Sequence, residues 1–192
     1  NASSERFIDS IMEIIEHYPK PMIDIMMNPL STHDTARVIT ELSGYQVPRD
    51  KRVAAESRLD RDGYLRAVEM SKLAYALMFA LPGIPSVYYG DEIGMQGGRD
   101  PFNRAPFTWH SVDPGLLENI IRLSKLRNEH KVLQTGFFKT LIAEDAVFVF
   151  ARYFKNRKDA FGNTGDNTFA VCAVNRSFEP QSVLVDISHF HI

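Results

Sequence analysis

The chain has 192 residues, of which 44% are hydrophobic and 24% charged, and its formal net charge is −2. Such a chain can bury a sizeable core, and its near-neutral charge gives no reason to expect nucleic acid or an anionic membrane as a partner. The longest apolar run, which includes Tyr75–Leu81, is too short to span a bilayer. The single cysteine, Cys172, excludes an internal disulfide framework. It is compatible with the cytoplasmic location that we expect, and secretion stays open as the alternative.

The first thirty residues predict a helix followed by a strand. The apolar spacing of residues 4–18 is that of an amphipathic helix, which begins at a Ser-Ser-Glu cap and stops at Pro19 and Pro21. Residues 22–30 form an apolar stretch that predicts a buried strand. Because proline cannot donate to a strand ladder, we expect this strand to end near Pro29.

The middle of the chain repeats the alternation of helix and strand. One or two helical turns are predicted over residues 35–42, and an exposed loop or weak helix over the polar segment 45–62. Residues 64–81 have a broad apolar face and predict a long helix. A second buried strand is predicted over residues 86–89. The long loop over residues 90–109 follows it, and long ordered loops in that position tend to be functional.

The last third of the chain changes from helical to strand-like periodicity. Residues 114–130 predict an amphipathic helix. Four β-rich runs follow, over residues 137–142, 146–154, 168–174 and 182–187. The change of period near residues 135–136 is therefore our predicted domain boundary.

A polar segment lies at the C-terminal end of each of the two predicted strands, and the second segment also includes its strand. Residues 31–37 read Ser-Thr-His-Asp-Thr-Ala-Arg, and residues 83–94 read Gly-Ile-Pro-Ser-Val-Tyr-Tyr-Gly-Asp-Glu-Ile-Gly. Taken alone, a His-Asp pair in a loop more often forms a local hydrogen bond than a catalytic site. The C-terminal ends of strands, however, are where a (β/α)8 barrel keeps its catalytic residues.

These two segments together resemble the α-amylase superfamily of retaining glycoside hydrolases. The loop over residues 99–109 is similar to that of neopullulanase, cyclomaltodextrinase and maltogenic amylase relatives. The resemblance implies an α/β fold followed by an all-β domain. Residues 1–135 would form the last part of a (β/α)8 TIM barrel, with strands 7 and 8 and their helices. Residues 136–192 would form a partial C-terminal antiparallel β-sandwich.

The resemblance also implies roles for the residues of the first segment. Asp34 would be the third catalytic carboxylate, which binds sugar hydroxyls next to the scissile bond and stabilises the transition state. His33 would bind a neighbouring hydroxyl of the same sugar. Arg37 would bind substrate or, as the alternative, orient the loop through a carboxylate.

The second segment has a structural interpretation as well as a functional one. We expect Asp91 and Glu92 to be loop carboxylates that accept backbone N–H bonds. Asp100 and Arg104 are candidate substrate-binding residues that can pair with each other or with a sugar. Trp109 offers a flat apolar face on which a sugar can stack, and its alternative is to pack under the loop.

A retaining glycosidase also needs a nucleophile and an acid/base about 5 Å apart. In the family that the chain resembles, the nucleophile lies in a Gly-x-Arg-x-Asp motif, which the sequence does not contain. We therefore expect a fragment that is inactive alone. Its parent would hydrolyse or transfer α-1,4 or α-1,6 links in α-glucans or malto-oligosaccharides.

Other interpretations stay open. The main alternative is a stand-alone carbohydrate-binding or structural module without catalysis, and another is a transporter subunit with a degenerate barrel. We expect no cofactor, and the sequence leaves open whether the parent holds a structural calcium. Two barrel strands without neighbours would expose edges and apolar faces, so we expect the chain either to form a homo-oligomer through them or to rearrange so that helices shield the strands.

Overall fold

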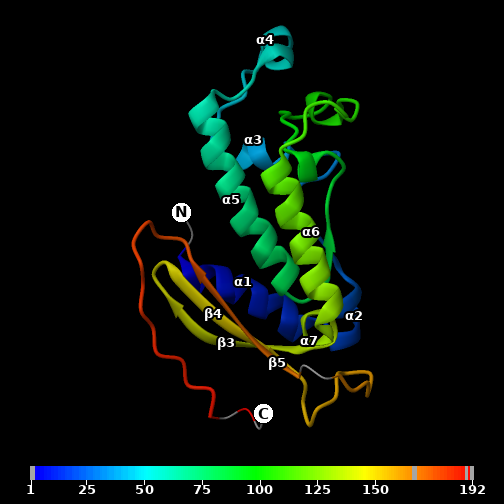
Figure 1. The fold of residues 1–192 in the computed structure, drawn as a ribbon, viewed down its shortest axis with the longest axis vertical. Helices are drawn as coiled ribbons and strands as arrows, with labels where there is room; N and C mark the ends of the chain where they lie inside the picture. The colour runs from blue at the N-terminus through cyan, green and yellow to red at the C-terminus, as the bar shows by residue number, and fades with distance from the viewer. Residues whose placement is uncertain (1–2, 166–167, 189, 191–192) are drawn as a thin grey trace. The chain divides into compact units, whose positions relative to one another are not determined.

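The computed structural model describes residues 3–165, 168–188 and 190, and the chain forms two compact units. Unit 1 comprises residues 1–26, 80–84 and 127–192, whereas unit 2 comprises residues 27–79 and 85–126. Figure 1 traces their helices and strands. The units group the first helices with the last strands. They are therefore a different division from the predicted domains, 1–135 and 136–192, which stay a prediction.

Unit 1 begins with two helices on either side of Pro19. Helix α1 (Ser4–His17) has Ser3 as its N-cap, whose hydroxyl accepts from the backbone N–H of Arg6 at 3.3 Å, as the sequence predicted. Helix α2 (Lys20–Ile25) has Pro21 in its first turn. A proline there costs no hydrogen bond, because first-turn N–H groups have no partner within the helix. The predicted strand over residues 22–30 is therefore wrong in its first part.

The rest of unit 1 is built around a three-stranded antiparallel sheet. Its strands are β3 (Phe137–Glu144), β4 (Val147–Tyr153) and β5 (Phe169–Asn175), in that spatial order. These confirm three of the four predicted β-rich runs. The fourth, over residues 182–187, is not a strand, and the Leu184 side chain within it is 96% exposed. The segment therefore buries too little apolar surface to offset the entropy of ordering it against the sheet.

The central strand β4 is buried along both faces and anchors unit 1. Phe148 packs edge-on against Phe7 of α1, with 5.7 Å between ring centroids. The short helix α7 (Lys131–Thr135) packs beside β4 and β5. The Ser4 hydroxyl donates to the carbonyl of Asp145, in the β3–β4 turn, at 2.7 Å. The start of α1 is thereby joined to the far end of the hairpin.

Buried arginines satisfy main-chain carbonyls inside unit 1. Arg152 of β4 is fully buried and donates to the carbonyls of Ala80 and Gly136 at 2.7 and 2.9 Å. Arg127 donates to the carbonyl of Leu81 at 3.2 Å. Burial, with the neighbouring charge of Arg127, lowers the pKa of Arg152 to about 9. Arg152 is thus still a cation at neutral pH and a strong donor to both carbonyls.

Unit 2 contains the two short strands that precede the polar segments. β1 (Met27–Pro29) ends at Pro29, as predicted, and is the neighbour of β2 (Ile84–Ser86), whose first residue belongs to unit 1. β2 lies before most of the predicted range 86–89. The expectation that both strands are buried is wrong, because Met27 is 67% exposed and Ile84 46%. A two-stranded sheet gives each strand one neighbour and leaves its faces largely open.

The core of unit 2 lies between two long helices, α5 (Arg61–Ala80) and α6 (Pro114–Glu129), which run side by side (Figure 1). Both helices were predicted from their apolar spacing. Shorter elements lie around them: α3 (Val38–Leu42), α4 (Lys51–Glu56), and the 3-10 turns η1 (Asp91–Ile93) and η2 (Phe102–Arg104). The buried core side chains are Val38, Ile39, Ala67, Val68, Tyr75, Met78, Phe79, Leu116, Ile120 and Leu123.

Candidate functional site

The loop after β1 is a tight turn stabilised by threonine hydroxyls. The backbone N–H of Thr32 donates to Thr35 Oγ1 at 2.8 Å, and the N–H of Asp34 donates to Thr32 Oγ1 at 3.2 Å. Such bonds take the place of a regular backbone ladder and favour turns. They leave His33 and Asp34 at the tip of the loop, with side chains 67% and 71% exposed.

The carboxylate of Asp34 lies between two nitrogen donors. His33 Nε2 is 3.2 Å from Asp34 Oδ2, and Arg104 Nη2 is 3.4 Å from Asp34 Oδ1. Arg104 Nε also lies 2.9 Å from Asp100 Oδ1. Each Asp34 oxygen thus has one protein partner and remains open to solvent. The carboxylate can therefore accept further hydrogen bonds from hydroxyl groups.

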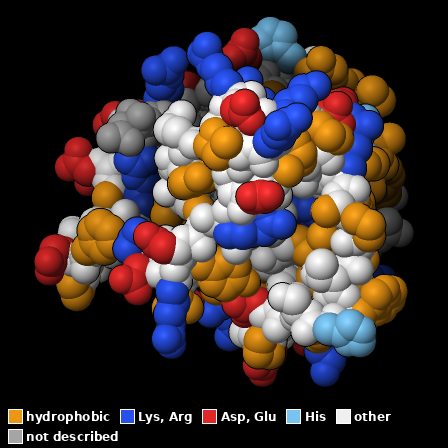
Figure 2. All heavy atoms as spheres, turned by 90° about the horizontal axis from the view of Figure 1, so that it is seen from above, with side chains coloured by type: hydrophobic (Ala, Val, Ile, Leu, Met, Phe, Trp, Pro, Cys, Tyr) orange, Lys and Arg blue, Asp and Glu red, His pale blue; other side chains and the backbone are white. Residues whose placement is uncertain are grey.

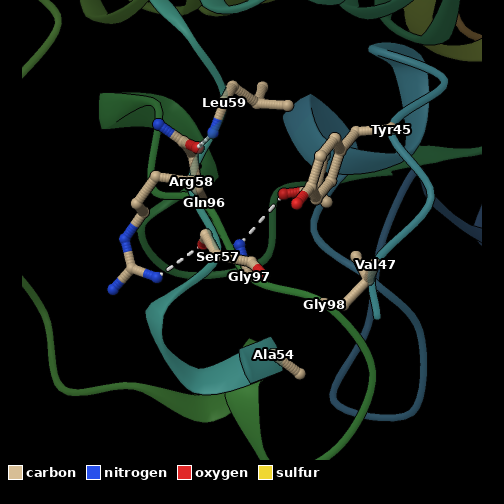
Figure 3. Close-up of a pocket in the computed structure, with 10 residues that line it drawn as sticks. Tyr45, Val47, Ala54, Ser57, Arg58, Leu59, Gln96, Gly97 and Gly98 are labelled. Carbon is tan, nitrogen blue, oxygen red and sulfur yellow. Dashed lines mark hydrogen bonds between the residues drawn. The ribbon is translucent and has the colours of Figure 1, made fainter. Parts of the chain in front are cut away.

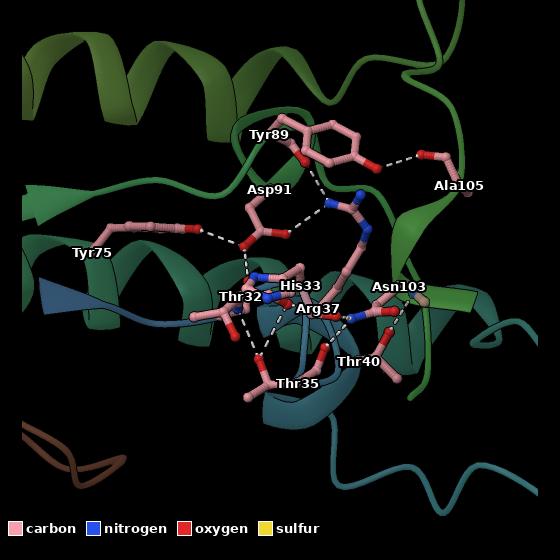
Figure 4. Close-up of polar contacts among 12 residues, drawn as sticks. Thr32, His33, Thr35, Arg37, Thr40, Tyr75, Tyr89, Asp91, Asn103 and Ala105 are labelled. Atoms are coloured by element: carbon pink, nitrogen blue, oxygen red, sulfur yellow. Dashed lines mark hydrogen bonds and ion pairs between the residues drawn. The ribbon is translucent and has the colours of Figure 1, made fainter. Parts of the chain in front are cut away.

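Beneath this loop lies a buried ion pair that joins it to the second polar segment. Arg37 Nη1 is 3.1 Å from Asp91 Oδ1 and donates to the carbonyl of Tyr89 at 2.6 Å (Figure 4). The guanidinium also lies over the rings of Tyr88 and Tyr89, 4.9 and 4.8 Å from their centroids. The pair is almost completely buried, with side chains 0% and 1% exposed.

Asp91 has three side-chain partners in this network. Ser31 Oγ donates to Asp91 Oδ2, and Tyr75 Oη lies 3.4 Å from the same oxygen. Burial raises the pKa of Asp91, while the Ser31 hydrogen bond and the Arg37 charge oppose that shift. Burial and the nearby carboxylate also raise the pKa of Tyr75. Asp91 was expected to bind backbone N–H groups; instead it receives side-chain donors from two other segments.

The approach of Arg37 to this segment depends on a glycine. Gly90 has a φ of 85°, in the left-handed region, and precedes the η1 turn. A Cβ at Gly90 would lie 2.3 Å from Met95 Sδ and 3.1 Å from Arg37 Nη1. A larger residue would therefore be strained and would crowd the ion pair.

Asn103 belongs to the site although the sequence did not single it out. It is fully buried in η2, and its Nδ2 lies 2.7 Å from the carbonyls of both His33 and Thr35. The signal in the sequence was weak, because an asparagine in a loop rich in glycine and proline is ordinary. Its partners lie some seventy residues earlier in the chain, so local pattern could not reveal them.

The structure brings most of the predicted residues together. His33, Asp34, Asp100 and Arg104 form a chain of ion pairs, and Asp100 and Arg104 pair with each other. Arg37 is fully buried, so it does not reach a substrate here and fits the alternative of orienting the loop through a carboxylate.

Trp109 lies elsewhere on the same long loop. Its side chain is 77% exposed, so the alternative that it packs under the loop is wrong. Its ring contacts that of Phe107, with 4.6 Å between centroids. Trp109 therefore presents an open aromatic face.

Other features of the surface are modest. On the face shown in Figure 2, basic, acidic and apolar side chains are interspersed. A small pocket lies beside Gly97, where Gln96 Oε1 accepts from the N–H of Leu59 at 2.7 Å (Figure 3). Within residues 3–165, 168–188 and 190, no three His, Cys, Asp or Glu side chains converge to bind a metal. Among the same residues, no helix has both the length and the hydropathy to cross a membrane.

Comparison with known proteins places the chain in a family. The family model "Alpha amylase, catalytic domain" matches residues 4–136. The chain is 37% identical over 181 residues to an amylopullulanase of Thermoanaerobacterium saccharolyticum, a match that covers 94% of this chain and 14% of that protein. It is 34% identical over 145 residues to a cyclomaltodextrinase of a Bacillus species, which covers 74% of this chain and 22% of the relative. The chain thus spans less than a quarter of the length of either relative.

Solved structures show the same likeness. A debranching enzyme from Nostoc punctiforme matches with a TM-score of 0.75 and 25% identity, over all of this chain and 33% of that one. A cyclomaltodextrinase structure matches 79% of this chain and 23% of its own, with a TM-score of 0.62 and 32% identity. The first of these likenesses extends over the whole chain and therefore includes the segments that carry the described site.

Proposed function

Because the chain belongs to the α-amylase family, we propose that it is part of a retaining glycoside hydrolase that acts on α-glucans or malto-oligosaccharides. The names of the relatives support this substrate class, since they include amylopullulanase, cyclomaltodextrinase and neopullulanase. The bonds cleaved would be α-1,4 or α-1,6 glucosidic links.

Within that enzyme, β1 and β2 would be the seventh and eighth strands of the (β/α)8 barrel. Two observations support this placement: the strands are neighbours, and a polar loop follows each. In such barrels the loops after the strands carry the catalytic residues. The sheet β3-β4-β5 would be part of the C-terminal β-sandwich over residues 136–192.

The observation that carries the proposal is the exposed Asp34 carboxylate held between His33 and Arg104. Asp34 would accept hydrogen bonds from sugar hydroxyls beside the scissile bond. Those bonds strengthen as the ring flattens and gains positive charge in the transition state. His33, exposed beside it, would bind a hydroxyl of the same sugar through a ring nitrogen.

The remaining residues would bind substrate or support that binding. Arg104 would hold Asp34 in place and keep further donors free for a sugar, because a guanidinium has five N–H groups. Asp100 would orient Arg104 through the contact at 2.9 Å. Trp109 would stack on a sugar ring farther along the substrate.

Asp34 stabilises charge but does not replace the nucleophile or the acid/base of a retaining enzyme. We therefore expect the 192-residue chain to release no sugar from maltoheptaose by itself. A measured turnover that Asp34→Asn abolishes would contradict this and would place all the catalytic groups inside the chain.

The role of Asp34 is tested in a hybrid enzyme. In this hybrid, the whole chain replaces the matching segment of the Thermoanaerobacterium saccharolyticum amylopullulanase, to which it is 37% identical. Asp34→Asn should lower kcat on maltoheptaose roughly 10²–10³-fold, the usual effect of removing one transition-state contact. Asp62→Asn, the same change at an exposed position on α5, is the matched control and should keep kcat within about twofold.

Two results would overturn the assignment. Equal kcat values for the hybrid and its Asp34→Asn variant would show that Asp34 does not act in the reaction. A hybrid that binds maltoheptaose without hydrolysing it would favour the alternative, a carbohydrate-binding module without catalysis.

A further inference from the structure

The η2 turn, which follows the second polar segment in the chain, contacts the loop that carries His33 and Asp34. The carboxamide of Asn103, in η2, points into the curve of this loop (Figure 4). Its Nδ2 lies 2.7 Å from the His33 carbonyl, 2.7 Å from the Thr35 carbonyl and 3.3 Å from the Thr32 carbonyl. A single side-chain nitrogen therefore lies within 3.3 Å of the carbonyls of three residues of the loop.

The two shorter contacts lie on either side of Asp34. A carboxamide nitrogen has two hydrogens, which suits two strong hydrogen bonds. The carbonyls of His33 and Thr35 belong to the peptide groups just before Asp34 and just after Thr35. Fixing both restricts the backbone at Asp34, and with it the direction of the Asp34 side chain. Because Asn103 is fully buried, it acts without contacting a substrate.

The η2 turn packs against Gly97, and Gly97 is hydrogen-bonded to the start of α3. The carbonyl of Gly97 accepts from the N–H of Arg37, and the N–H of Gly97 donates to Thr40 Oγ1, each at 3.0 Å. A Cβ at Gly97 would lie 2.5 Å from the carbonyl oxygen of Phe102 and 3.0 Å from Asn103 Cα. Gly97 is therefore needed for the close approach of the two backbones.

Arg104, the residue after Asn103, also contacts the loop that carries His33 and Asp34. Arg104 Nε donates to the His33 carbonyl at 3.0 Å, and its Nη2 lies 3.4 Å from Asp34 Oδ1. Both η2 residues thus act on the same short loop, Asn103 on its backbone and Arg104 on its carboxylate.

We propose that Asn103 is a positioning residue for Asp34: its buried carboxamide fixes the backbone of residues 32–35 so that the Asp34 carboxylate stays between His33 and Arg104. The inference rests on the proposed function of Asp34. It adds that the catalytic loop depends on a residue from the segment after β2.

The structural half of the proposal is tested by amide hydrogen exchange on the 192-residue chain. Asn103→Leu keeps the branching and the number of heavy atoms of the side chain and removes both donors. We expect the amides of Asp34 and Thr35 to exchange at least about tenfold faster, while amides of α5 keep their rates. The control is Asn163→Leu, which removes the hydrogen bond that the Asn163 side chain donates to Asp159 in unit 1. It should leave the exchange rates of Asp34 and Thr35 unchanged.

A second variant covers the case in which Asn103→Leu does not fold. Gly97→Ala retains the Asn103 side chain, but its added Cβ pushes the η2 turn away from its present position, so the same amides should exchange faster. Unchanged exchange at Asp34 and Thr35 in a folded variant of either kind would overturn the proposal.

The catalytic half is tested by a double-mutant cycle in the hybrid enzyme. Asn103→Leu should lower kcat at least about tenfold and change KM by less than about twofold. In the Asp34→Asn background it should lower kcat less than about twofold, because Asn103 acts through Asp34. Equal losses in both backgrounds would show a general structural defect and overturn the positioning role.

These outcomes separate the two proposals. If Asp34→Asn leaves kcat unchanged, the proposed function fails, whatever the exchange data show. If Asp34→Asn lowers kcat but Asn103→Leu does not, the function stands and the positioning role of Asn103 is wrong.

Discussion

At the scale of single residues, the buried ion pair of Arg37 and Asp91 is an interaction whose disruption should be costly. Both side chains are essentially unexposed, and their charged atoms are 3.1 Å apart. A buried pair is costly to form, but removal of one partner leaves an uncompensated charge in a medium of low dielectric. Burial already raises the pKa of Asp91, and the Arg37 charge opposes the shift.

We predict that Arg37→Met destabilises the chain by about 3–5 kcal/mol, because Asp91 then stays buried without its cation. The free energy of unfolding is measured by urea titration followed by circular dichroism. Methionine keeps much of the contact with the rings of Tyr88 and Tyr89, so the change mainly reports the lost charge.

The double variant Arg37→Met/Asp91→Leu is the control for this prediction. It removes both charges and should recover a large part of the lost free energy, since apolar replacements of buried pairs are often nearly neutral. If the double variant is as unstable as the sum of its parts, the loss comes from packing and the ion-pair explanation is wrong.

The candidate site was predictable from sequence as far as its local motif extends. His33, Asp34 and Arg104 come from segments whose residue order resembles a known family, and the structure brings them together. The roles of Asn103 and Asp91 were not predictable. Their partners lie far away in the chain. Such long-range contacts do not produce a periodic pattern in the residues around either side chain, so the local sequence does not reveal them.

At the scale of elements, the connection between β4 and β5 is organised around one carboxylate. Asp159 Oδ1 accepts from the backbone N–H groups of Phe161 and Asn163, at 2.9 and 2.8 Å. Its Oδ2 accepts from Thr135 Oγ1, at the end of α7, at 2.8 Å. The connection is thereby tied to both a helix and its own turn.

These contacts predict a pH-dependent stability. Burial acts to raise the pKa of Asp159, but hydrogen bonds from Thr135 and Asn163 outweigh it and hold the pKa below the ordinary value of 3.8. A group whose pKa is lower in the folded state stabilises the fold above its unfolded pKa. The stabilisation is lost as the pH falls through the folded value.

We therefore expect Asp159→Asn to cost about 1–3 kcal/mol at pH 7, where hydrogen bonds to a charged acceptor are lost. The difference from the unchanged chain should shrink as the pH falls below 3.8 and then through the lower folded pKa, because Asp159 becomes protonated in the fold and then resembles the variant. Urea unfolding at pH 7 and at acid pH measures both differences. A difference that stays constant with pH would contradict the charge-based explanation.

The elements themselves were predicted best where a period extends over many residues. α1, α5 and α6 follow from apolar spacing over three or more turns. α2 was missed because Pro21 stands in a first turn, where proline favours a helix instead of ending it. The run over residues 182–187 has strand-like composition, but strand formation also requires a partner and buried surface, which sequence composition does not supply.

At the scale of the whole molecule, several large apolar side chains are left in contact with solvent. On α1 and the segment after it, Ile14, Tyr18, Met22 and Ile25 are between 45% and 63% exposed. Exposed apolar surface of this kind is often an interaction site.

We predict that the chain self-associates through this surface. Sedimentation velocity should show an apparent mass that rises with concentration over about 1–100 μM, the range of weak interfaces. The variant Met22→Lys/Ile25→Lys introduces like charges there and should remain a monomer. An unchanged chain that is monomeric throughout this range would contradict the prediction.

The contact between Ser4 and Asp145 has a consequence for how the protein is made. A chain leaves the ribosome from its N-terminus, so α1 emerges long before the β3–β4 hairpin against which it packs. Every residue of unit 2 is synthesised in that interval. Unit 2 can therefore fold before the β3–β4 hairpin is made, while Phe7 and Ile8 of α1 are not yet covered by it. Until the hairpin is made, the Phe7 ring lacks the Phe148 ring against which it packs.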